Sequence, residues 1–255
     1  MTTTLRTPTA QHARPHSPES TARPVAHPSR RAVLKSGLFG FAGLAGTKPA
    51  SADEGVQSSD RNQRRAPSLD GLQQNQIGMR ALENSQLAVS MYPTFTYNAS
   101  GGAGIAETQD LGDGRMHVTF DAQTLYIPDV YSKTATFLGA PLVPPFRIRI
   151  EPVKLEGVIN KATGEAQLQF IANFMFTASK LYKAPPLYVV TNLTTEGVQG
   201  SRRSGQGQRM DPNGFTKLVG VATVPKTHSW PIDKFLMLPD ETFAVMVTQF
   251  VFPTA

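Results

Sequence analysis

Apolar and polar residues alternate with a period of two over much of the chain, most clearly from Phe146 to Thr177. Phe146, Ile148 and Ile150 alternate with charged neighbours, and a second series follows the turn at 160–164. That second series consists of Ala166, Leu168, Phe170, Ala172, Phe174 and Phe176. Such a period puts one apolar face on each strand. The stretch therefore predicts a long antiparallel hairpin whose apolar face needs a partner layer.

Shorter alternating runs, bounded by glycine and proline, follow the same rule. They lie at 86–91, 115–121, 134–138, 187–190, 218–224 and 243–252. About nine to twelve strands with such turns predict an all-β chain: a single antiparallel β-barrel or β-sandwich domain. A closed sheet is favoured because it leaves fewer unpaired edges. We expect this β-domain to span 85–255, with a long mobile loop at 196–214.

The residues before the β-domain differ in character. Residues 53–84 are mostly polar, which predicts an arm or linker. Its apolar residues suggest a short helix within it, formed around Leu69, Leu72, Ile77, Met79 and Leu82.

Charge divides the chain in two. Residues 1–52 hold seven Lys or Arg and one acid, whereas 53–255 hold 18 of each sign. The basic character therefore belongs to the N-terminal segment, and we expect no nucleic-acid partner. The chain has no Cys, which excludes disulfides, thiolate metal sites and Cys nucleophiles.

The basic segment has the order of an export signal. Residues 1–29 are rich in Thr, Ser, Pro, Ala and Arg, which is typical of an organelle transit peptide. Ser29, Arg30, Arg31 and the residues up to Lys35 precede a short glycine-rich apolar run. Ala50, Ser51 and Ala52 then form a small-residue cleavage pattern.

This segment resembles a twin-arginine export signal, with Arg30 and Arg31 as the arginine pair and cleavage near Ala52. A transit-like segment before such a signal is similar to the two-part address of thylakoid-lumen proteins. The resemblance implies a mature chain in the chloroplast thylakoid lumen, the alternative being a bacterial periplasmic or secreted protein. No later apolar run is long enough for a transmembrane helix.

The inward aromatic residues form the candidate binding site. Phe120, Phe146, Leu168, Phe170, Phe174 and Phe176 either line a cavity for a lipid, pigment or quinone, or simply fill the core. Arg202, Arg203 and Arg209, in the predicted loop, either bind an anionic partner or are simply solvated. Trp230, near a proline-rich turn, is a candidate anchor on a protein or membrane surface.

Catalytic and metal-binding patterns are weak. His117 and His228 follow the N-terminal segment, and neither has a second His at ligand spacing. The chain has no Gly-x-Ser-x-Gly elbow and no dinucleotide-binding loop. We therefore assign no catalytic residue, metal ligand or cofactor.

Two roles fit these observations. Proteins with such an address include many accessory and assembly factors of the photosystems, so the first role is a non-enzymatic lumenal protein that binds a photosynthetic membrane complex. The second is a barrel-type carrier of a small hydrophobic ligand. An enzyme with a dispersed active site is the weakest hypothesis.

Overall fold

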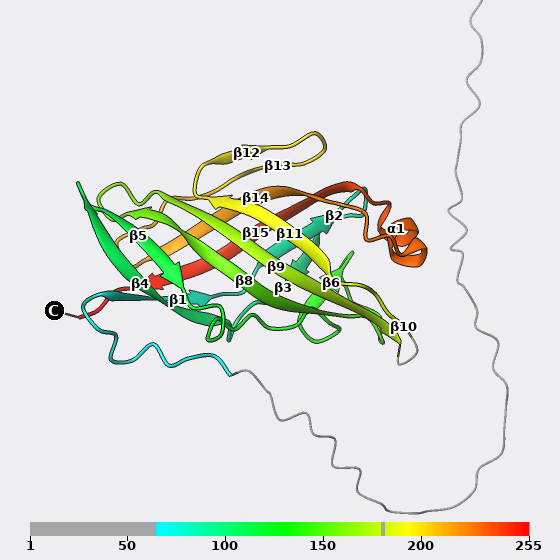
Figure 1. Ribbon diagram of the computed structural model, residues 1–255, viewed down its shortest axis with the longest axis horizontal. Coiled ribbons are helices and arrows are strands. Elements are labelled where there is room, and N and C mark those ends of the chain that lie inside the picture. Colours follow the sequence, from blue (N-terminus) through cyan, green and yellow to red (C-terminus); the bar gives the residue numbers. More distant parts are fainter. Residues whose placement is uncertain (1–64, 180–181, 255) are drawn as a thin grey trace, which may run out of the picture. The chain divides into compact units, whose positions relative to one another are not determined.

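The computed structural model describes residues 65–179 and 182–254. Its elements, drawn in Figure 1, are β1 (Gln76–Ala81), β2 (Ser85–Val89), β3 (Phe95–Tyr97), β4 (Ala103–Gly112), β5 (Arg115–Phe120), β6 (Ala135–Phe137), β7 (Ala140–Pro141), β8 (Arg147–Asn160), β9 (Ala166–Ser179), β10 (Tyr182–Lys183), β11 (Leu187–Thr194), β12 (Gly197–Gln199), β13 (Ser204–Gln206), β14 (Phe215–Val224), α1 (Trp230–Leu236) and β15 (Asp240–Val251).

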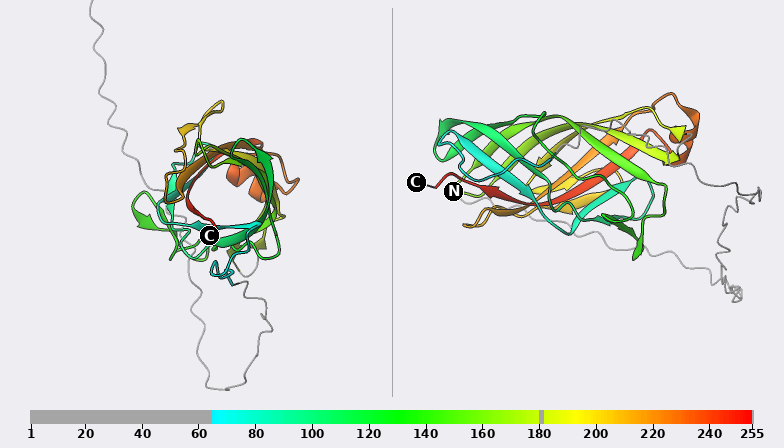
Figure 2. Two further views of the ribbon diagram at one scale, coloured as in Figure 1. Left: turned by 90° about the vertical axis from the view of Figure 1, so that its left-hand side faces the viewer. Right: turned by 90° about the horizontal axis from the view of Figure 1, so that it is seen from below.

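Eight strands close into an antiparallel barrel. Their order is β1-β4-β5-β8-β9-β11-β14-β15, and β15 pairs with β1 to complete the ring. The left view of Figure 2 looks along the axis of this barrel. The all-β prediction is confirmed, and of its two forms the chain adopts the barrel.

The long hairpin is confirmed as β8 and β9, which pair from Arg147↔Thr177 to Ile159↔Ala166. A bulge interrupts the ladder after Pro152, which has no backbone N–H to donate. The bulge buries Pro152 and turns Val153 outward, where it is 47% exposed.

One half of the barrel has a wider wall. β1 and β2 lie one after the other along β15, through Ala81↔Thr248 and then Gln86↔Val245. From β2 the sheet continues to β3, β6 and β7 instead of turning back to β4. The segment between β5 and β6 completes the wall, through bridges that join Tyr126 to β4 and Val130 to β8.

Helix α1 lies across the end of this wider half (Figures 1 and 2). Ser229 is its N-cap residue, and Pro231 lies in the first turn, where a missing N–H has no effect. Ile232 and Leu236 are buried, and Met237 ends the helix with a left-handed conformation. Among the described residues, no helix has the length and apolar character to cross a membrane.

The predicted arm and its helix need correction. Residues 76–81 of the predicted 53–84 arm form β1, a strand of the barrel, and no helix forms around them. Ile77 and Met79 are buried two residues apart, so the period is that of a strand.

The predicted loop at 196–214 also contains structure, because β12 and β13 form a hairpin there. Arg30, Arg31, Ala50 and Ala52, together with the 1–29 segment and the cleavage site, lie outside the described residues.

Side chains pack the other half of the barrel, which we call the filled half. Its buried residues are Ile77, Met79, Ala106, Val118, Phe120, Leu125, Leu155, Ile159, Ala166, Leu168, Leu193, Leu218 and Phe250. An eight-stranded barrel is just wide enough to be filled in this way.

Candidate ligand cavity

The wider half, which we call the hollow half, encloses a cavity of about 340 Å³. Its lining comes from β2, β3, β6, β8, β9, β11, β14, β15 and α1, and includes Leu87, Tyr97, Ile150, Phe174, Val189 and Phe235. The floor is formed by residues that also belong to the core of the filled half, among them Met79, Leu125 and Leu155. A volume of this size lies in the range of small-molecule sites, about 300–1,000 Å³.

Four of the six predicted cavity residues line this space: Phe146, Phe170, Phe174 and Phe176. Phe120 and Leu168 do not line it, because they lie deeper, in the core of the filled half. Both sets share the inward face of their strands. The two sets differ in their position along the barrel axis, which cannot be predicted from a period of two.

Four aromatic rings gather where α1 meets the cavity. Phe235 of α1 lies 6.0 Å from Phe146, 5.9 Å from Phe176 and 5.8 Å from Tyr92, measured between ring centroids. Phe235 is 44% exposed, so the cavity reaches the surface beside this ring. Such aromatic pairs add about 0.5–1.5 kcal/mol each beyond the burial of area.

The second half of α1 is tied to the end of β2. The Tyr92 hydroxyl donates a hydrogen bond of 2.6 Å to the Phe235 carbonyl, and the Ser90 hydroxyl donates one to the Leu236 carbonyl. Two adjacent carbonyls of the helix end, which lack helical partners, are satisfied in this way.

The lining is almost entirely apolar. None of the described residues that line the cavity is charged, and its polar members are Ser85, Tyr92, Tyr97, Tyr126, Thr191 and Thr242. The Tyr97 hydroxyl donates to the Pro128 carbonyl, and the Thr242 hydroxyl donates to the Ala88 carbonyl. Burial raises the pKa of Tyr97, since the phenolate would be poorly solvated.

Two hydroxyls remain for a ligand. Within the described chain, the side-chain oxygens of Tyr126 and Thr191 make no hydrogen bond. Thr191 is 6% exposed and lies on β11 beside Phe170 of β9. These hydroxyls can orient a polar oxygen of a molecule that is otherwise apolar.

Comparison with known proteins gives no matching family model, curated protein or solved structure.

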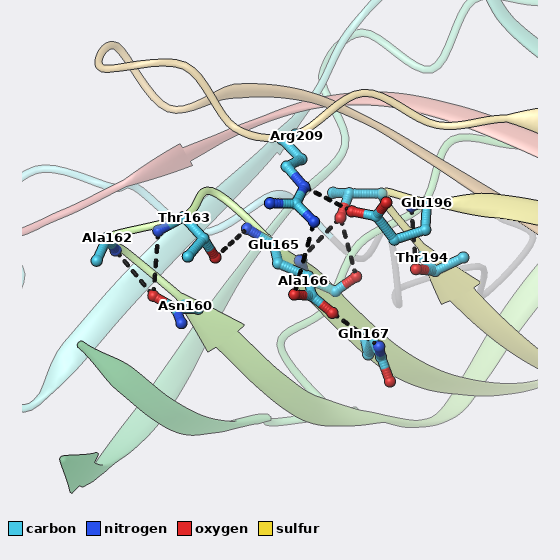
Figure 3. A network of polar contacts seen from close by, with 10 residues as sticks. Asn160, Ala162, Thr163, Glu165, Ala166, Gln167, Thr194, Glu196 and Arg209 are labelled. Atoms are coloured by element: carbon cyan, nitrogen blue, oxygen red, sulfur yellow. Dashed lines mark hydrogen bonds and ion pairs between the residues drawn. The ribbon is translucent and has the colours of Figure 1, made fainter. Parts of the chain in front are cut away.

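The three predicted partner-binding arginines are engaged within the chain. Arg209 pairs with Glu196 at 2.7 Å and lies 4.0 Å from Glu165, a network drawn in Figure 3. The hydrogen bond that the Arg209 guanidinium donates to the Glu196 carboxylate raises the pKa of Arg209, because it favours the charged form. Arg202 pairs with Asp240 at 3.1 Å.

Arg203 binds the end of β2. Its guanidinium donates to the Ser90 carbonyl at 2.7 Å and to the Tyr92 carbonyl at 2.5 Å. The β12–β13 hairpin is thereby connected to the residues that hold α1.

Glu241 anchors the same hairpin. Its carboxylate accepts hydrogen bonds from the backbone N–H of Ser201 at 2.5 Å, of Arg202 at 2.8 Å and of Arg203 at 3.1 Å. These bonds, first that of Ser201, lower the pKa of Glu241 because they favour the charged form. The hairpin lies over Phe243, which is 7% exposed on the outer face of β15.

Trp230 lies apart from this network, on α1, and is 76% exposed. His117 is half-buried on β5, and His228 is exposed before α1. Among the described residues, no three His, Asp or Glu side chains gather as metal ligands.

Sequence reasoning missed the wall opposite the β8–β9 hairpin. Leu87, Tyr97 and Phe235 line the cavity but were not among the candidates. The alternation at 86–91 could have indicated Leu87, and Ser229 with Pro231 could have indicated the start of α1.

Proposed function

We propose that this protein binds a small, uncharged hydrophobic molecule in the cavity of the hollow half. The observation that carries the proposal is a space of about 340 Å³ whose described lining holds no charged side chain. A ligand that covers this apolar surface is stabilised by about 25 cal/mol of binding free energy for each Å² removed from water.

The lining favours neutral molecules over ionised ones. A carboxylate inside the cavity would have no cationic partner, and an unpaired buried charge is strongly unfavourable. The hydroxyls of Tyr126 and Thr191 suit a ligand with a carbonyl or hydroxyl oxygen. Among lipids, pigments and quinones, we therefore favour neutral members over fatty acid anions.

The test is to fill the cavity from its wall. Ala244 lies on β15 opposite Leu87, and both side chains line the cavity. Titration of the full-length chain with a neutral fluorescent hydrophobic probe should give saturable binding. Ala244→Phe should weaken that binding about ten-fold or more, since the ring occupies the ligand's space.

Ala162→Phe is the matched control, because Ala162 is exposed in the β8–β9 turn. The control variant should bind the probe as the parent chain does. Equal binding by both variants, with unchanged melting temperatures, would contradict the proposal. Organic extraction of the purified chain, followed by mass spectrometry, should identify the ligand class.

The role as an accessory protein of a photosynthetic membrane complex stays a prediction, as does the thylakoid address. Comigration with a photosystem complex on native gels tests the role. A fluorescent fusion of residues 1–60, with and without Arg30→Lys plus Arg31→Lys, tests the address.

A further inference from the structure

We propose that the α1 end of the barrel docks on an anionic lipid bilayer, with Trp230 placed among the headgroups. We infer that docking serves to exchange the cavity ligand with the membrane, and this purpose rests on the proposed function. Docking itself is carried by the surface of this end and is measured without any cavity ligand.

The docking surface, which we call the rim, consists of segments 90–94, 137–146, 182–186 and 225–240. Strands β2, β9 and β14 run into these segments, and β3, β8, β11 and β15 start from them. Their antiparallel register places them together at one end of the barrel. α1 and β10 mark this end in Figure 1.

The rim exposes six large apolar side chains. Their exposed fractions are 76% for Leu138 and Trp230, 67% for Met91 and Val143, 44% for Phe235 and 37% for Met237. Single exposed apolar residues are ordinary on protein surfaces, but a group of them at one end marks an interaction site.

This apolar surface continues the lining of the cavity along the chain. Leu138 directly follows the lining residue Phe137, and Val143 follows Leu142. Phe235 belongs to the lining itself. A neutral ligand could pass between cavity and bilayer without crossing a charged side chain of the lining.

The charges of the rim favour an anionic surface. Lys183, Lys226 and Lys234 are exposed, and within the described chain none of them is in an ion pair. The two acids of the rim are engaged. Asp240 pairs with Arg202, and Asp233 accepts hydrogen bonds from the Thr227 backbone at 2.8 Å and hydroxyl at 2.7 Å.

The opposite end carries the opposite sign. Six acids and three bases lie in the turns of that end, which are 70–75, 110–115, 160–165, 195–196 and 207–214. The acids are Asp70, Asp110, Asp113, Glu165, Glu196 and Asp211, and the bases are Arg115, Lys161 and Arg209. An anionic bilayer would therefore attract the rim and repel the far end.

A bilayer fits this surface better than a protein partner does. The apolar side chains stand on separate turns, with Leu138 at the tip between β6 and β7, rather than on one flat face. Trp flanked by Lys is the combination found at membrane interfaces, where the ring lies among headgroups and the ammonium groups meet phosphates.

The first experiment uses Trp230 as its own reporter, because it is the single Trp of the chain. Vesicles of phosphatidylglycerol and phosphatidylcholine should shift its emission to shorter wavelength, and brominated lipid should quench it. Phosphatidylcholine alone should give a weaker response, and added salt should reduce the response to anionic vesicles. The basic N-terminal segment has no Trp, so it does not produce this signal.

The second experiment measures vesicle flotation of full-length variants. Lys183→Gln, Lys226→Gln and Lys234→Gln together should weaken partitioning about 100-fold, because each basic residue near an anionic surface adds about five-fold. The control, Arg80→Gln with Arg115→Gln and Lys161→Gln, makes the same change in net charge away from the rim and should have a smaller effect.

A second variant set removes the apolar contacts. Leu138→Ser, Val143→Ser and Trp230→Ser together should weaken partitioning about ten-fold or more. The control set is Val153→Ser, Tyr188→Ser and Val190→Ser, at exposed apolar sites of the barrel wall. It should bind as the parent chain does.

The outcomes separate docking from ligand binding. Unchanged Trp230 emission with anionic vesicles, or equal partitioning of rim and control variants, would overturn docking even if the cavity binds its probe. Trp230 insertion without probe binding would instead leave docking in place and refute the proposed function. A rim that binds a protein but no vesicle would also overturn the proposal.

Discussion

The two halves of this barrel are made from the same strands, yet one is packed and the other is hollow. β8, β9 and β15 run through both halves and keep one apolar face inward throughout. In the filled half, eight strands close tightly enough for side chains to meet. In the hollow half, the perimeter is lengthened by β2, β3, β6 and the segment between β5 and β6. Inward side chains therefore no longer meet across the interior of the barrel.

Small residues widen the same half further. Ala81, Ala99, Ala103 and Ala244 all line the cavity, where larger side chains would have reduced it. Hydrophobic patterning therefore sets which face is inward, whereas perimeter and side-chain size set whether the inside is filled.

The largest expected effect distinguishes the halves directly. Phe250→Ala in the filled half should lower the free energy of unfolding by about 3–5 kcal/mol, because Phe250 is 1% exposed and its loss leaves a new void. Phe174→Ala in the hollow half should lower it by about 1–2 kcal/mol, because the half-buried ring already borders open space. Urea unfolding of both variants measures the difference.

Equal losses from the two variants would mean that the halves are packed alike. Phe174→Ala should also keep the binding of the neutral probe, since it enlarges the cavity.

The sequence predicted the sheet better than it predicted the cavity. Alternation identified the β8–β9 hairpin and the inward set of Phe170, Phe174 and Phe176, because a period of two is a local property. A period of two does not show the bulge after Pro152, which exchanges the faces of the next residues and turns Val153 outward.

Non-local features could not be predicted in the same way. That Phe120 and Leu168 belong to the filled half depends on which strands become neighbours. The wider wall arises because β2 and β3 leave the ring to pair with β6, and alternation is silent on pairing partners. The arginines at 202, 203 and 209 were candidates for binding a partner, but each is engaged within the chain. Arg202 and Arg203 contact residues far away in the sequence, whereas Arg209 pairs with Glu196 of its own loop.

The next effect tests how the hollow half holds its helix. Arg203→Ala should lower the free energy of unfolding by about 2 kcal/mol, because the Ser90 and Tyr92 carbonyls both lose a charged donor. Arg202→Ala is the matched neighbour. The Arg202 side chain is 55% exposed, so its pair with Asp240 should contribute less than about 1 kcal/mol. Differential scanning calorimetry compares the two, and a larger loss from Arg202→Ala would contradict this assignment.

Hydrogen exchange sharpens the same comparison. Arg203→Ala should speed exchange at the backbone amides of α1 while the filled half keeps its protection, because local contacts set local opening.

The smallest expected effect depends on pH. The pKa of Glu241 is lowered from its ordinary value of 4.5 by the N–H groups of Ser201, Arg202 and Arg203. A group with a lowered folded pKa stabilises the fold above its unfolded pKa, and this contribution disappears as pH falls through the folded pKa. Glu241→Gln should therefore melt below the parent chain at pH 7, by less than Arg203→Ala does. The two melting temperatures should converge in acid, as the parent carboxylate is protonated. A Glu241→Gln deficit that persists unchanged as the solution is acidified would mean that shape, rather than charge, holds the hairpin against β15.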